Sequence, residues 1–142
     1  MRFIITATIE DGAPKADAAF DPAIFKAYMK FNEDLHNAGV LVASEGLLPA
    51  SPGARVAVEG GRRKVVDGPF AESKELVGGF YVIDVPSFED AKAWALRCPV
   101  GMASADILEI RQLTGEEDIP KPFLDMAASV APNWTATLTK KK

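Results

Sequence analysis

The sequence has few of the residues that build disulfides and metal centres. Its 142 residues include one cysteine, Cys98, and one histidine, His36. One cysteine cannot form an internal disulfide, and one histidine cannot supply the paired imidazoles of most catalytic zinc or non-haem iron sites. No phosphate loop, dinucleotide fingerprint, nucleophile elbow or zinc-protease motif occurs either. We therefore expect no disulfide, no metal and no cofactor.

Basic residues and long apolar runs are also scarce. There are 16 Lys and Arg against 20 Asp and Glu, for a net charge of −4. The dense basic runs, 62–64 and 140–142, are short, whereas a nucleic-acid surface needs a basic patch to neutralise phosphates. No apolar run reaches the length of a membrane span, and residues 1–10 lack the cleavage region of a signal peptide. We expect a cytoplasmic protein that binds neither nucleic acid nor membrane.

What is present is the composition of one folded domain. Hydrophobic residues make up 48% of the chain and charged residues 25%, which is average for folded proteins and argues against disorder. Alternating and helical apolar spacing predicts strands at 2–10, 40–48, 55–59, 64–66, 76–85 and 106–113, and helices at 22–38 and 87–98.

This order of elements predicts an α+β ferredoxin-like sandwich, with both helices on one face of the sheet and a β-hairpin inserted between its halves. The domain is expected to cover residues 1–114. Residues 115–142 form a C-terminal extension with a short helix through 123–127 and a polar tail after Pro132. We expect this extension to pack on the domain or on a partner.

The strand pattern also predicts what lies on the sheet face without helices. If Tyr81, Ile83 and Ile110 lie under the helices, the alternate residues face away. These are Arg2, Ile4, Thr6, Thr8, Phe80, Val82, Asp84, Ile107, Glu109 and Arg111. Such a face is too apolar to leave to water, so we infer a face-to-face homodimer enclosing a cavity that holds Glu109, Arg111 and Asp84. Alternatively, Glu109 and Arg111 pair with each other across a solvated surface.

One stretch carries a family resemblance. Residues 65–83, VVDGPFAESKELVGGFYVI, resemble the signature of the DGPF-motif proteins in the YCII-related superfamily. Residues 28–33, 39–41, 45–47 and 109–111 are similar to the same family. The resemblance runs from Met1 to about Leu113 and implies a dimeric α+β barrel built from two ferredoxin-like chains. Some members are encoded beside, or fused to, extracytoplasmic-function sigma factors.

The resemblance also implies a mechanism that this chain does not retain. Some relatives in the superfamily are dehydrochlorinases of chlorinated hydroxyquinols, which are thought to use a His–Asp pair on the first helix. Aligning this helix on Gly39 places Tyr28 at the His position and Asn37 at the Asp position. Tyr28 then remains as a candidate proton donor.

The remaining candidates have a structural and a functional interpretation. Asp67, Gly68 and Pro69 are typical turn residues, and the same turn would present Asp67, as a base, at the mouth of the cavity. Tyr28, Asn32 and His36 share one helix stripe, where they either tie the helix to the sheet or reach a ligand. The candidate catalytic residues are Asp67 and Tyr28; the ligand-binding candidates are Arg111, Glu109, Phe70, Asn32, Glu72 and Lys74.

Two functions follow from these candidates. In the first, a homodimer binds a small organic molecule, oriented by Glu109 and Arg111, and carries out cofactor-independent acid/base chemistry of the lyase or isomerase type. In the second, the protein is a non-catalytic accessory or regulator, for example a partner of a sigma factor, and the Asp67 loop is a recognition surface.

Overall fold

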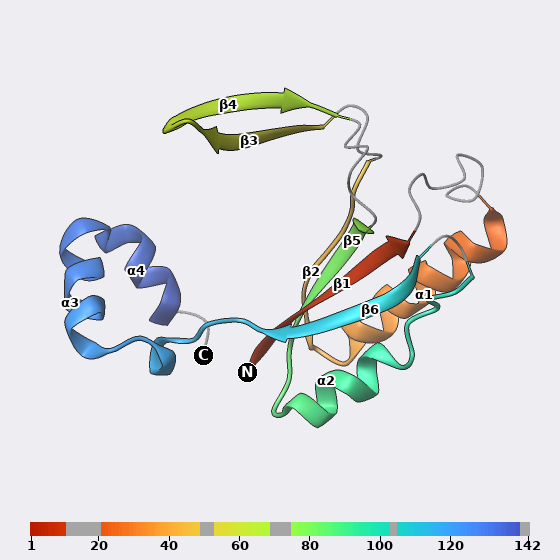
Figure 1. Ribbon diagram of the computed structural model, residues 1–142. Coiled ribbons are helices and arrows are strands. Elements are labelled where there is room, and N and C mark those ends of the chain that lie inside the picture. The colour runs from red at the N-terminus through yellow and green to blue at the C-terminus, as the bar shows by residue number, and fades with distance from the viewer. Residues whose placement is uncertain (11–20, 49–52, 69–74, 103–104, 140–142) are drawn as a thin grey trace.

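The computed structural model describes residues 1–10, 21–48, 53–68, 75–102 and 105–139 (Figure 1). In chain order the elements are β1 (Arg2–Glu10), α1 (Pro22–Asn37), β2 (Leu41–Gly46), β3 (Ala54–Glu59), β4 (Arg62–Asp67), β5 (Glu75–Asp84), α2 (Phe88–Ala95), β6 (Ala105–Gln112), the 3-10 helix η2 (Glu116–Asp118), α3 (Lys121–Val130) and α4 (Pro132–Thr139).

Four strands form one antiparallel sheet in the order β2-β5-β1-β6. Helices α1 and α2 lie together on one face of this sheet (Figure 1). Two βαβ halves with this strand order make a ferredoxin-like α+β sandwich, which confirms the predicted fold class. Strands β3 and β4 pair only with each other among the described strands and form the predicted inserted hairpin, whose turn glycines Gly60 and Gly61 both have positive φ.

Both helices of the sandwich begin where their capping residues predict. The Asp21 carboxylate accepts hydrogen bonds from the backbone N–H of Ala23 and Ile24, at 2.9 and 3.3 Å. Ser87 accepts a hydrogen bond from the N–H of Asp90 at 3.1 Å. These side chains satisfy N–H groups that have no partner inside a helix.

The core lies between this helix pair and the sheet. It contains Phe3, Ile5, Phe31, Leu35, Tyr81, Ile83, Val85, Ala91, Ala95 and Cys98. Leu108 and Ile110 of β6 pack against it. The strand parity predicted from the sequence is therefore correct for β1, β5 and β6.

The most informative differences from the predicted elements are at the end of α2 and in residues 132–139. Helix α2 ends at Ala95, and Cys98 is buried beyond it in the following turn. Residues 132–139, predicted as a polar tail, form helix α4. Pro132 suits a first helical turn, and the N–H of Thr135 is bonded to the carbonyl of Ala131 at 2.9 Å, so proline begins this helix and does not prevent it.

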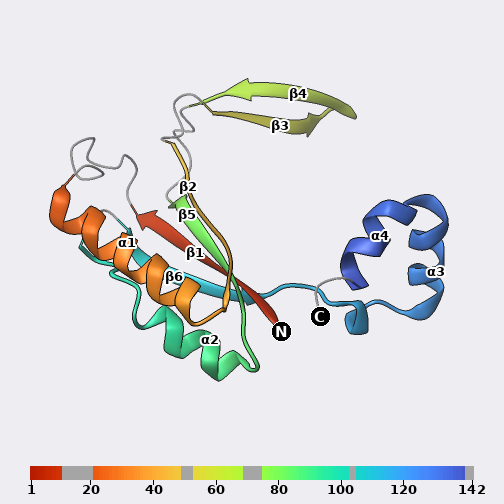
Figure 2. The same ribbon diagram turned by 180° about the vertical axis from the view of Figure 1, so that it is seen from behind.

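The hairpin and the C-terminal helices stand away from the sandwich. In Figures 1 and 2, the β3–β4 hairpin and the α3–α4 pair both extend away from the side on which α1 and α2 lie. Within the described residues, each makes no more than marginal contact with the four-stranded sheet. In that part of the chain, no helix is long and apolar enough to cross a membrane.

Candidate functional site

The open face of the four-stranded sheet is organised in two rows across the strands. Registered residues of neighbouring antiparallel strands share a face. One row runs from β2 to β6 through Glu45, Phe80, Thr6 and Glu109, and the next runs through Ala43, Val82, Ile4 and Arg111. The face is thus apolar in its centre and carries charged groups on its edge strands.

Glu109 and Arg111 are both exposed on β6. In the described part of the chain, neither side chain forms an ion pair or a hydrogen bond. Mutual pairing of these two groups, the alternative interpretation of the sequence, is therefore absent from the structure. Both groups are available to an external ligand.

Asp84, the third ionisable group expected in the cavity, forms an ion pair within the chain. Its Oδ1 lies 3.1 Å from the α-amino group of Met1, which also donates to the carbonyl of Val85 at 3.0 Å. These contacts join the beginning of β1 to the end of β5. Asp84 consequently serves the sheet, and Glu109 and Arg111 are left of the three groups expected in the cavity.

Tyr28 and Asn32 are residues of α1. They lie between this helix and the opposite face of the sheet. Ser44 of β2 donates a hydrogen bond to Asn32 Oδ1 at 3.2 Å, and Tyr28 packs against the core. The structure therefore does not bring Tyr28 and Asn32 together with Glu109 and Arg111. A single cavity using all four, as the sequence suggested, does not exist within one chain.

Tyr28 instead belongs to a small polar cluster in the helix layer. Burial, followed by the proximity of Cys98, raises the pKa of the Tyr28 phenol. Burial likewise raises the pKa of Tyr81, which is hydrogen-bonded to Cys98. Burial also raises the pKa of the Cys98 thiol to about 11, against hydrogen bonds from Val100 and Tyr81 that lower it. All three groups are thus neutral at pH 7, so they can donate a proton but are poor bases and nucleophiles.

Asp67 is the one motif candidate that the structure describes. Asp67 is exposed at the end of β4, where the N–H of Gly68 bonds the carbonyl of Gly53 at 2.8 Å and closes the hairpin. This bond continues the β3–β4 pairing past Asp67, so Asp67 ends a strand, and both interpretations of the motif stay predictions. Phe70, Glu72 and Lys74 lie outside the described residues.

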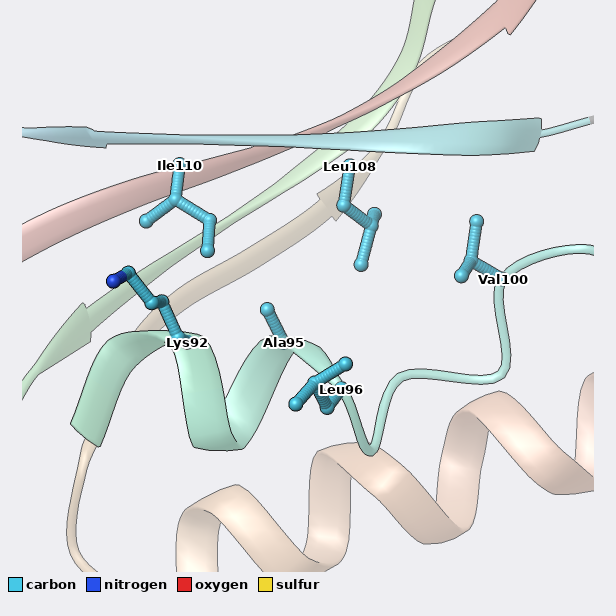
Figure 3. Close-up of a pocket in the computed structure, with 6 residues that line it drawn as sticks. All are labelled: Lys92, Ala95, Leu96, Val100, Leu108 and Ile110. Atoms are coloured by element: carbon cyan, nitrogen blue, oxygen red, sulfur yellow. The ribbon is translucent and has the colours of Figure 1, made fainter. Parts of the chain in front are cut away.

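A hollow of about 390 Å³ opens between α2 and β6. Leu108 and Ile110 point into it from the strand, with Lys92, Ala95, Leu96 and Val100 around it (Figure 3). Its one charged group is Lys92. The Nζ atom of Lys92 forms an ion pair with Glu89 Oε1 at 2.7 Å and lies over the ring of Phe88. The hollow is an uncovered part of the edge strand, since α2 is only eight residues long.

Sequence reasoning missed Glu45 and Ser44. The register of β2 against β5 shifts between Leu41 and Ala43, and one extra residue exchanges the two faces of a strand. Ala43 and Glu45 therefore lie on the open face, while Ser44 turns toward Asn32. The run of alternating residues contains no signal for this bulge.

The sequence of this chain matches a family model and a relative of known sequence. A family model described as the YCII-related domain matches residues 1–115. An uncharacterized protein of Rhizobium meliloti strain 1021 is 37% identical over 76 residues, which are 54% of this chain and 61% of that relative. The matched region thus spans about three fifths of that relative's length.

A solved structure is also similar. It is 5-chloro-2-hydroxyhydroquinone dehydrochlorinase from Burkholderia phenoliruptrix AC1100, in complex with 2,5-dihydroxybenzoquinone. The alignment covers 84% of this chain and 100% of that one, with a TM-score of 0.47 and 13% sequence identity.

Proposed function

The chain belongs to the YCII-related family, and on that premise we propose that it forms a face-to-face homodimer that binds a small organic anion between the open faces of the two sheets. The observation that carries the proposal is the pair Glu109 and Arg111, without partners among the described residues, beside the apolar centre of a sheet face.

The energetics of such a face favour both parts of the proposal. Ile4, Phe80 and Val82 are part-buried on the sheet face that none of the described helices covers, and a second apolar face would remove them from water. Enclosing the Arg111 guanidinium at the same time is costly unless an anion pairs with it. A carboxylate or phenolate ligand supplies this charge, and arginine binds a carboxylate through two parallel hydrogen bonds.

Acid/base chemistry in this cavity would use Glu109. Its carboxylate is two residues from Arg111 on the same face of β6, where it can accept a proton or a hydrogen bond from a ligand hydroxyl. Tyr28 is on the other side of the sheet, and Asp67 is at the base of the hairpin. We therefore assign to Glu109 the proton-handling role that the sequence suggested for Tyr28 and Asp67.

Binding of hydroxybenzoates, measured by isothermal titration calorimetry, tests the ligand class. We expect Arg111→Gln to weaken binding of these probes by about tenfold or more. Lys26→Gln, which removes a positive charge from the exposed side of α1, is the matched control and should bind as the parent does. Equal affinities of Arg111→Gln and the parent, or no binding by the parent, would refute the proposal.

Light scattering tests the dimer separately. The parent chain should have twice the 15.2 kDa mass of one chain at micromolar concentration. A monomer under these conditions would overturn the enclosed cavity.

A further inference from the structure

Two elements outside the sandwich expose apolar surfaces that no described part of their own chain covers. The first is the hairpin. Val56 and Val65 are directly paired, and Val58 is on the same face of the ribbon. These three side chains, the valine face, are 69%, 69% and 74% exposed. A two-stranded ribbon without a covered face is marginally stable in water, so this hairpin requires a partner surface.

The second element is helix α3. Phe123, Met126 and Val130 recur at helical spacing and form an apolar stripe. Their side chains are 61%, 59% and 80% exposed, although the other side of α3 packs on α4. The stripe is therefore the face of the helical pair that has no cover among the described residues.

The charges of the two elements are complementary. Residues 54–67 contain four basic and two acidic side chains, whereas residues 115–139 contain four acidic and one basic. The acidic groups include Glu116 and Glu117, ahead of α3, and the basic groups include Arg62 and Arg63, at the tip of the hairpin. Opposite charges around apolar patches favour one mode of association over others.

The arrangement of the chain points to a second copy as the source of the cover. The hairpin and the helical pair join the sheet at opposite ends of its strands, and both extend away from the side on which α1 and α2 lie (Figures 1 and 2). They make no more than marginal contact with each other among the described residues. In a two-fold dimer each chain offers one hairpin and one α3 helix, so two identical contacts form and the assembly closes.

We propose that the α3 stripe of one copy packs on the valine face of the other copy's hairpin. The inference rests on the homodimer proposed above and adds to it the surfaces that hold the two chains together. It gives residues 115–139 the role of a dimer arm.

Site-directed cross-linking tests this contact in the full-length chain. The only native cysteine, Cys98, is 6% exposed, and its raised pKa keeps it in the unreactive thiol form. Cysteines introduced singly as Val65→Cys and Met126→Cys therefore provide the reactive thiols. We expect a mixture of the two variants, under mild oxidation, to give a covalent dimer containing one chain of each.

Matched controls use exposed positions on the other side of the same elements. Lys64→Cys lies on the opposite face of the ribbon from Val65, and Ala128→Cys, two residues after Met126, lies on the opposite side of α3 from the stripe. One control mixture contains Lys64→Cys in place of Val65→Cys, and the other contains the α3 control in place of Met126→Cys. Each should give at least tenfold less mixed dimer. Because the substituted side chains are all exposed, these variants should fold as the parent does.

Each remaining outcome counts against the contact. If light scattering shows a dimer but Val65→Cys and Met126→Cys do not cross-link, the arm proposal fails and the face-to-face dimer stands. If the parent is a monomer, both fail. Cross-linking within one chain carrying both substitutions, without cross-linking in the mixture, would mean that the hairpin is covered by its own arm.

Discussion

Cys98 shows how burial decides the chemistry of a single residue. A free thiol invites a catalytic interpretation, but this one lies among Tyr28, Tyr81 and apolar side chains. The sequence places it on the inner side of the second helical segment and could indicate that it is buried. It could not reveal the hydrogen bond from Tyr81, because the turn that follows α2 brings Cys98 to β5 only in the folded chain.

The Cys98 thiol should make the fold sensitive to alkali. Burial raises its pKa from an ordinary value of 9.0 to about 11 in the folded chain. The folded state therefore holds the proton more tightly than the unfolded state. Stability from this group is complete below pH 9 and is lost as the pH rises through 11, by about 3 kcal/mol at most. Tyr81 and Tyr28, whose pKa values are also raised, act in the same direction at higher pH.

Alkylation by iodoacetamide, followed by mass spectrometry, measures this shift. We expect the native chain to react at a rate that is half-maximal near pH 11, and the chain in urea near pH 9. Urea unfolding of Cys98→Ala should show a smaller loss of stability between pH 9 and 10 than the parent. A native alkylation midpoint near pH 9 would contradict the assignment.

At the scale of elements, irregular strands limit what a sequence can reveal. The double glycine 78–79 predicts a bulge or a close approach of backbones, and both occur. The register of β1 on β5 skips Gly78, and a Cβ atom on Gly79 would lie 2.9 Å from the carbonyl oxygen of Glu45. By contrast, the bulge in β2 has no glycine, so its exchange of faces at Ser44 and Glu45 could not be predicted. The predicted alternation of side chains between the two faces of the sheet was therefore correct only along the stretches of a strand that contain no bulge.

Replacing Gly79 by alanine should separate β2 from β5. The added methyl group would push against the backbone of β2, which can move only by disturbing its pairing with β5. We expect a loss of about 1–3 kcal/mol in the free energy of unfolding, measured with urea. Gly46→Ala is the control, since Gly46 is paired with Gly79 but a Cβ atom there meets nothing within 4 Å. Equal stabilities of the two variants would disprove the close approach as a constraint.

At the scale of the molecule, the sequence predicted the sandwich better than the site. Apolar periodicity reports which side of an element is buried, and this was enough to define the sheet and its helices. A site depends on which side chains meet across the fold. Tyr28 and Arg111 both looked like ligand contacts in the sequence, yet the sheet separates them. The apolar pattern of one chain indicates that its open face is covered, but it does not give the contacts with the covering chain.

The separation of the C-terminal helices from the sandwich predicts that they are dispensable for its folding. No residue of α3 or α4 belongs to the buried core, and the match to the family ends at residue 115. We therefore expect the chain truncated after Gly115 to fold, with amide NMR signals of the four-stranded sheet at the positions seen in the parent. Its stability should lose the dependence on protein concentration that a dimer arm supplies, because folding and association are coupled by mass action. Collapse of the amide dispersion in the truncated chain would show that the helices support the sandwich itself, whereas a retained concentration dependence would show that the sheets associate without them.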